Sequence, residues 1–276
     1  MCELFAMSSD GPATVKYSLE EFARHGGLTR ENSDGWGITY YEGAEVRLIK
    51  EAAPAASSPW VDFIAHQNLA SNTVIAHVRM ASRGHPTLEN THPFERELGG
   101  RRHVFAHNGT MHEIESALPL AGRRYRPIGE TDSEHAFCLL LERLQDIWAN
   151  GDEVPAWQKR FEIVTRFAWD LQPLGQANFL YSDGDVLFVH AQKRRYQLPD
   201  GSLTEARPPG LNLLIKQHTG PDHGVSAKGL DVSVDGKQAM LFASVPLTND
   251  LWVPLPEGAV LAIKDGHELG RNLPGG

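Results

Sequence analysis

Hydrophobic and polar positions predict strands in the first part of the chain, helices in the middle and strands again towards the end. Residues 2–7 alternate loosely between the two kinds, which predicts a short strand with Cys2 at its start. Gly43 separates two apolar runs that we interpret as a β-hairpin. The other early strands are predicted over residues 38–41, 46–49, 73–79 and 103–106, the last ending at His107-Asn108-Gly109.

The strongest helical pattern follows Thr131, where apolar residues recur every three or four positions as far as Trp148. Cys138 lies near this stripe and is interpreted as a buried small hydrophobe. Three more helices are predicted: one from Ser18 to about Gly26, one opened by Ser58-Pro59, and one from about Ala156 to Leu171.

The last third of the chain returns to strand patterns, with Asp-Gly pairs as turns between them. Strands, then helices, then strands predict an α+β protein in which two antiparallel sheets carry helices outside, and we expect residues 1–276 to form one domain. The later strands are predicted over residues 178–181, 186–190, 211–216, 239–243 and 260–264.

Composition and charge indicate what kind of protein this is and which partners are disfavoured. The 276 residues are 41% hydrophobic and 22% charged, which suits a globular protein with a sizeable core. A net charge of −9 argues against nucleic acid or an anionic membrane as the main partner. No signal peptide is visible and no apolar run approaches the ~18 residues of a membrane span. Two cysteines make no disulfide framework, so we expect a cytoplasmic protein with a reduced Cys2.

Cys2 is the first candidate for chemistry. Removal of Met1 would leave one residue with both a thiol and a free α-amine. Their ordinary pKa values are about 8.5 and about 7.7–8.0, so the amine is a plausible base for the thiol near neutral pH. A cysteine at this position is by itself weak evidence, and a site needs further groups.

Three polar clusters at the ends of predicted strands or at a helix start supply such groups. Arg79 ends a strand, and its planar guanidinium matches a carboxylate, although a surface ion pair is the simpler interpretation. Asn108 and Gly109 offer a side-chain amide and a backbone N–H, the donors of an oxyanion hole, although an Asn-Gly pair is more often a turn. Asp132 opens a helix, where it is either a cap or a partner for an ammonium group.

In this order the motifs resemble those of class II glutamine amidotransferases. The resemblance runs through His77-Val78-Arg79-Met80-Ala81-Ser82, Asn90-Thr91-His92-Pro93-Phe94, His107-Asn108-Gly109 and Glu130-Thr131-Asp132. The second half is similar to the stand-alone, YafJ-like members that cut γ-glutamyl amides. The resemblance implies the N-terminal nucleophile hydrolase fold, a four-layer αββα sandwich.

The resemblance also implies a role for each residue. Cys2 would be the nucleophile, and Asn108 with Gly109 the oxyanion hole. Arg79 would bind the α-carboxylate of glutamine, and Asp132 its α-ammonium. The stretch from Arg79 to about Glu89 is similar to the family's glutamine loop. Trp36 and Gly37 lie where the family has a glycine turn near the nucleophile, and Glu3 replaces the glycine that many members carry after the cysteine.

Three functions remain open at this point. The chain is a glutaminase-type enzyme that releases ammonia for a separate synthase, a free-standing hydrolase of γ-glutamyl compounds, or a non-catalytic binding member of the fold. We expect no cofactor and no metal, because the histidines match no metal-ligand spacing and no phosphate-binding loop occurs. The basic runs 99–102 and 123–126 are interpreted as solvated loops.

Overall fold

The computed structural model places most of the chain. It describes residues 2–15, 34–67, 69–80, 84–122, 124–149, 153–198, 200–217, 225–227, 230–234 and 238–273. The helix predicted from Ser18 lies outside these residues, as do Ala81 and Ser82 of the resemblance motif.

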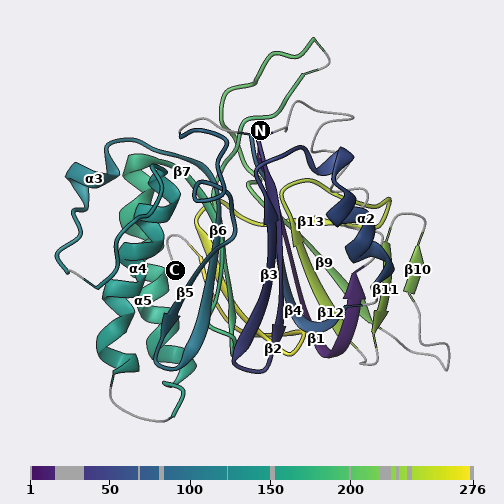
Figure 1. Ribbon diagram of the computed structural model, residues 1–276, viewed down its shortest axis with the longest axis horizontal. Helices are drawn as coiled ribbons and strands as arrows, with labels where there is room; N and C mark the ends of the chain where they lie inside the picture. Colours follow the sequence, from purple (N-terminus) through teal and green to yellow (C-terminus); the bar gives the residue numbers. More distant parts are fainter. Residues whose placement is uncertain are drawn as a thin grey trace.

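The first sheet is antiparallel, and the long strand β1 lies near its middle (Figure 1). On one side β1 pairs with β4, with Glu3 opposite Val78, and on the other it pairs with β12. Among the described residues its order is β13-β9-β12-β1-β4-β2-β3, and the short strands β10 and β11 extend from β1. The bounds are β1 Glu3–Val15, β2 Trp36–Glu42, β3 Glu45–Glu51, β4 Ala70–Val78, β9 Asn212–Gln217, β10 Val225–Ala227, β11 Leu230–Val234, β12 Gln238–Ala243 and β13 Val253–Pro254.

The second sheet is also antiparallel and faces the first. Its long strand β6 pairs with the edge strand β5 on one side and β7 on the other, with Asn108 opposite Asn178. The described order is β15-β14-β8-β7-β6-β5. The bounds are β5 Phe94–Leu98, β6 Arg101–Met111, β7 Gly175–Ser182, β8 Leu187–Ala191, β14 Ala259–Lys264 and β15 His267–Asn272.

Helices cover the outer faces of the two sheets (Figure 1). α4 (Asp132–Trp148) packs on β5 and β6, and α5 (Trp157–Leu171) packs on β7, β8 and β14. α2 (Pro59–His66) lies outside the first sheet, while the one-turn helix α3 (Ile114–Ala117) contacts α4. The predicted four-layer αββα sandwich is thereby confirmed. Two 3-10 turns, Ala55–Ser57 and Gln172–Leu174, complete the described helical segments.

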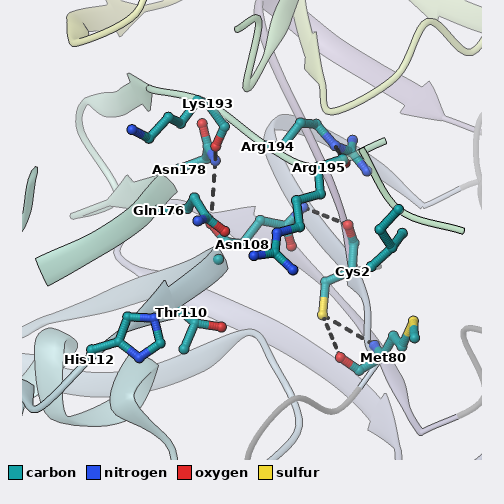
Figure 2. Close-up of a pocket in the computed structure, with 12 residues that line it drawn as sticks. Cys2, Met80, Asn108, Thr110, His112, Gln176, Asn178, Lys193, Arg194 and Arg195 are labelled. Carbon is teal, nitrogen blue, oxygen red and sulfur yellow. Dashed lines mark hydrogen bonds between the residues drawn. The ribbon is translucent and has the colours of Figure 1, made fainter. Parts of the chain in front are cut away.

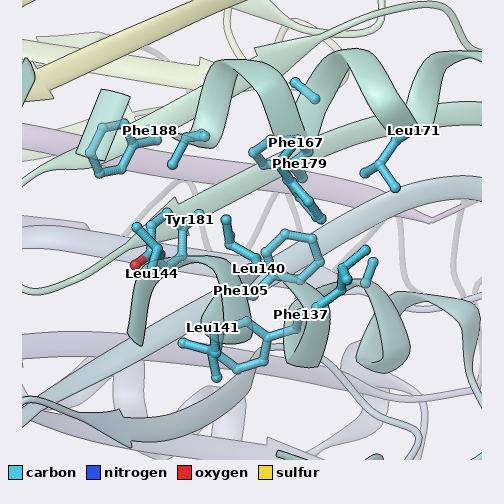
Figure 3. Close-up of a cluster of buried hydrophobic side chains, with 14 of the residues drawn as sticks. Phe105, Phe137, Leu140, Leu141, Leu144, Phe167, Leu171, Phe179, Tyr181 and Phe188 are labelled. Carbon is cyan, nitrogen blue, oxygen red and sulfur yellow. The ribbon is translucent and has the colours of Figure 1, made fainter. Parts of the chain in front are cut away.

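Alternation along the strands divides the core into three layers. On β1, Leu4 and Ala6 point between the sheets, whereas Phe5 and Met7 point to the outer core beneath α2. The third layer lies between the second sheet and its two helices (Figure 3). There the rings of Phe105 and Phe137 stack with centroids 5.4 Å apart. The loose alternation read from the first residues therefore reflects a strand that is buried on both faces.

Most predicted elements are present, although the short strand predicted over residues 2–7 extends as β1 to Val15. The β2–β3 hairpin turns at Gly43, which has φ +65°, and Ser58 caps α2 by accepting a hydrogen bond from the Trp60 N–H. Thr131 caps α4, whose predicted apolar stripe is buried, and Cys138 lies buried in this helix as expected. The short edge strands β5, β13 and β15 were not predicted.

Two predictions were wrong. The strand expected to end at His107 continues to Met111, because residues 107–111 pair with β7 as part of β6. Arg101 and Arg102 do not lie in a solvated loop but begin β6. Arg101 donates to the carbonyls of Asp183 and Gly184, whereas Arg102 bonds Glu45 and Glu95.

The described residues contain neither a membrane-spanning helix nor a metal-binding cluster. None of their helices is long and apolar enough to cross a membrane. No group of three or more histidine, cysteine or acidic side chains among them is placed to hold a metal ion.

Arg160 of α5 forms a buried ionic cluster with the turn between β7 and β8. Its guanidinium lies 2.6 Å from the Asp183 carboxylate and 2.7 Å from that of Asp185. Arg160 and Asp183 are almost completely buried, so Asp183 would carry an uncompensated charge without Arg160.

We predict that Arg160→Met lowers the free energy of unfolding by about 3–5 kcal/mol, because it leaves Asp183 buried without a counter-ion. The matched control is Arg143→Met, which breaks the half-exposed Arg143–Asp170 pair and should cost at most about 1 kcal/mol. Urea unfolding monitored by circular dichroism measures both. Equal losses in the two variants would contradict the assignment.

Several histidines are buried within the sandwich and remain neutral in the folded protein. Burial lowers the pKa of His77 to about 3 and that of His103 and His190 to about 4. Burial also lowers the pKa values of His92 and His107. In the unfolded chain such groups take up a proton below about pH 6.5. The unfolded state then binds more protons, so stability is lost as the pH falls below that value.

We predict that the free energy of unfolding drops between about pH 6.5 and about pH 4, by up to about 1.4 kcal/mol per pH unit for each buried histidine. Urea midpoints across this range measure the slope. His190→Gln should reduce it, whereas His267→Gln, at an exposed position, should not. A slope that His190→Gln leaves unchanged would refute the assignment.

Candidate active site

Cys2 lies immediately before β1, at the end of the first sheet. Its Sγ is 3.1 Å from both the backbone nitrogen and the backbone oxygen of Met80, because β4 ends opposite the start of β1. Burial raises the pKa of the Cys2 thiol, while the hydrogen bond with Met80 and the positive charge of Arg79 act in the opposite direction. The thiol is thus held beside a donor and a cation, as a developing thiolate requires.

Asn108 reaches Cys2 from the other sheet. Its Nδ2 donates to the Cys2 carbonyl at 2.7 Å and to the Ser244 Oγ at 2.9 Å. Ser244 also accepts the Leu4 N–H at 2.9 Å, so β1, β6 and the segment after β12 meet at this point. The residues predicted for the nucleophile and the oxyanion hole are therefore brought together, although 106 positions separate them.

Gly109 follows on β6 with φ +137°, a conformation that side-chain-bearing residues rarely adopt. A Cβ at this position would lie 1.8 Å from the Gln176 carbonyl oxygen, so no larger residue fits without moving β7. Glycine is needed here because two backbones approach closely, not because the chain turns.

A cavity of about 260 Å³ opens beside Cys2, Asn108 and Gly109 (Figure 2). No acidic side chain occurs among the described residues that line it. The other lining residues are Met80, Thr110, His112, Gln176, Asn178, Lys193, Arg194, Arg195 and Leu203.

Arg79 is 2% exposed and is not among the residues that line this cavity. Its guanidinium bonds backbone carbonyls instead. Nη1 donates to the His85 carbonyl at 3.1 Å and Nη2 to the Gly84 carbonyl at 3.1 Å. The Arg79 backbone N–H donates to the Gly35 carbonyl at 2.7 Å. Arg79 is near enough to Cys2 for each charge to shift the pKa of the other group.

Asp132 is the first residue of α4 and is 5% exposed. Its carboxylate accepts the Met111 N–H at 2.7 Å and the Ser133 N–H at 2.9 Å. It therefore ties α4 to the end of β6, two residues beyond Gly109, and does not contribute to the cavity wall.

Trp36 and Gly37 begin β2 and pair with Val78 and His77 of β4. The Trp36 indole donates to Glu51 at 3.1 Å, and a Cβ on Gly37 would lie 2.4 Å from the His92 carbonyl oxygen. Both residues support the strand that ends at Arg79 and lie outside the cavity lining.

Sequence reasoning missed an ion pair next to Cys2. Arg194 donates to both carboxylate oxygens of Glu3, at 2.9 and 3.1 Å, and the two side chains are 4% and 0% exposed. The unusual Glu3 and the run Lys193-Arg194-Arg195 were the available signals, but their pairing spans 191 positions and no local pattern links them.

Comparisons with known proteins agree with the fold and the motifs. The family model described as "Glutamine amidotransferases class-II" matches residues 1–273. The Escherichia coli protein named "Putative glutamine amidotransferase YafJ" is 35% identical over 94% of this chain and 95% of its own. A Haemophilus influenzae protein with the same description, without the name YafJ, is 33% identical over 98% of this chain and 86% of its own.

Solved structures give the same grouping. The crystal structure of a "predicted glutamine amidotransferase" from Pseudomonas aeruginosa is 32% identical, covers 98% of this chain and all of its own, and has a TM-score of 0.67. Glutamine phosphoribosylpyrophosphate amidotransferase from B. subtilis shares the fold at 16% identity and a TM-score of 0.59, over 98% of this chain and 49% of that protein. From the matched family model and these relatives, the chain belongs to the class II glutamine amidotransferases.

Proposed function

We propose that the protein cleaves the γ-glutamyl amide bond through a thioester on Cys2. The observation that supports this most directly is the convergence of the Cys2 sulfur, the Asn108 amide and Gly109 on one cavity. A nucleophile, two donors for a developing oxyanion and room for a small substrate are the parts that acyl transfer requires.

Removal of Met1 would give Cys2 the α-amine that acts as its base. The sulfur then forms a bond to the amide carbon as the amine takes the thiol proton. The carbon–nitrogen bond breaks when that proton passes to the leaving nitrogen, which departs as ammonia or an amine. Water hydrolyses the thioester, releasing the γ-carboxylate and restoring the thiol.

Negative charge on the carbonyl oxygen would be met by Asn108 and by the Gly109 N–H. Both Asn108 Nδ2 protons are engaged without substrate, with the Cys2 carbonyl and with Ser244. The oxyanion would therefore share or replace the bond to the Cys2 carbonyl. The bond to Ser244 would keep the amide in place meanwhile.

Arg79 and Asp132 would recognise the α-amino acid head of the substrate. Arg79 now satisfies the carbonyls of Gly84 and His85, so a carboxylate would take over donors that presently hold the segment after Arg79. This exchange supports the interpretation of that segment as a loop that responds to substrate. Trp36 and Gly37 would act indirectly, by supporting the end of β4.

A free-standing hydrolase of γ-glutamyl compounds is the second candidate function. The observation in its favour is the positive charge that Lys193 and Arg195 bring to the cavity, which suits a leaving group larger than ammonia that carries negative charge. A glutaminase that supplies ammonia to a separate synthase would use the same catalytic residues.

We predict that Cys2→Ala abolishes release of glutamate from glutamine or γ-glutamyl amides, because no other group can form the thioester. Cys138→Ala is the matched control. Burial in α4 raises the pKa of the Cys138 thiol to about 12, so it should contribute nothing to turnover. A coupled glutamate assay measures both, and retained activity in Cys2→Ala would overturn the proposal.

We predict that Asn108→Ala lowers kcat/KM by on the order of 10²–10³-fold, since losing one oxyanion donor costs about 2.7–4 kcal/mol of transition-state stabilisation. Asn212→Ala is the control, because Asn212 bonds the Ser244 carbonyl but does not line the cavity. It should retain most activity. Equal losses would show that Asn108 serves only to hold the sheets together.

A further inference from the structure

The segment between β8 and β9, residues 192–211, forms one wall of the cavity. It projects beyond the ends of the sheets as the green hairpin near the N-terminus in Figure 1. Isolated bridges pair Arg194 with Arg207 and Gln197 with Leu203. We call this segment the basic hairpin, because Lys193, Arg194, Arg195 and Arg207 lie on it.

The basic hairpin is anchored beside the nucleophile. Arg194 donates two buried hydrogen bonds to the carboxylate of Glu3, the residue after Cys2. A buried pair of this kind is costly to break, because either charge alone would remain desolvated. The backbone of the neighbouring Arg195 is thereby held beside the cavity, and Glu3 neutralises the Arg194 charge.

Arg195 and Lys193 bring net positive charge to the cavity of a protein whose net charge is −9. Within the described part of the chain, neither side chain forms an ion pair, and the lining contains no acidic residue. Figure 2 shows the Arg195 guanidinium extending toward Asn108 and Cys2, whereas the Lys193 amine points farther out. A cation so placed fits an anionic group of the bound substrate.

We propose that Arg195 binds a carboxylate on the leaving amine, so that the preferred substrates are γ-glutamyl amino acids or short γ-glutamyl peptides. This rests on the proposed thioester chemistry at Cys2. In the proposed function Arg79 and Asp132 bind the α-amino acid head, which leaves the cavity residue Arg195 for a second carboxylate. Glutamine would leave as ammonia and give Arg195 no partner. In the proposed reaction the amino acid or peptide departs with the proton from the Cys2 amine.

The test compares γ-glutamylalanine with γ-glutamylethylamide, which differ by the carboxylate alone. Released glutamate measures kcat/KM for both in enzyme whose loss of Met1 is verified by mass. Arg195 is exposed but lines the cavity, so the preference should lie between the few-fold effect of a surface pair and the ~10⁴-fold discrimination of a buried one. We expect roughly tenfold or more in favour of γ-glutamylalanine.

Arg195→Gln should reduce this preference to about one, mainly through KM for γ-glutamylalanine, and Arg195→Lys should restore part of it. The matched control is Arg207→Gln on the same hairpin. Arg207 stacks on Tyr196 at 4.8 Å outside the cavity lining, so its loss should leave the preference intact.

Binding provides a readout that is independent of turnover. Calorimetry with Cys2→Ala should show tighter binding of γ-glutamylalanine than of γ-glutamylethylamide, and Arg195→Gln in that background should remove the difference. Equal kcat/KM values for the two substrates in the unmodified enzyme would overturn the inference while supporting the thioester chemistry.

Equal losses on both substrates in Arg195→Gln would also overturn the inference, because they would place Arg195 at the amino acid head. Absence of hydrolysis of every γ-glutamyl compound by the processed enzyme would instead overturn the proposed function. Failure of the inference and failure of the chemistry are therefore distinguishable.

Discussion

The hydrogen bond from the Asn108 amide to the Cys2 carbonyl is the contact on which the site depends. It joins β6 of one sheet to the start of β1 in the other, and Ser244 of a third segment bonds both the Asn108 amide and the Leu4 N–H of β1. Such a bond needs the two sheets to be packed in one register, because a shift of one residue would turn Asn108 towards α4. The sandwich thus acts as a scaffold that aligns a donor with residue 2.

The second constraint is the buried pair of Glu3 and Arg194. Burying two charges gives little net stability compared with an apolar pair, so its contribution here is better understood as fixing position. It holds a hairpin from the second half of the chain against the residue that follows Cys2. The proposed catalytic residues Cys2, Asn108 and Gly109 come from the first half of the chain, and the positive charge of the cavity comes from Lys193 and Arg195 in the second half.

The sequence pattern was sufficient to predict those elements that depend on residues close together in the chain. The β2–β3 hairpin needs Gly43, and α4 needs Thr131 and its apolar stripe. The strand β15 was missed because its polar sequence is ordered by pairing with β14, and the end of β6 was missed because an Asn-Gly pair is also typical of a turn. Motif order predicted that Cys2, Asn108 and Gly109 lie together at one cavity. It could not show that Arg79 and Asp132 bond backbone groups, since those partners depend on tertiary packing.

The central claim is that residue 2 carries the acyl group during turnover. The most direct measurement is peptide mass spectrometry of the processed enzyme after acid quenching during turnover of a γ-glutamyl substrate. The account predicts a γ-glutamyl thioester on the N-terminal peptide that begins at Cys2. A glutamyl adduct on any other residue, or steady turnover by enzyme that keeps Met1, would contradict it.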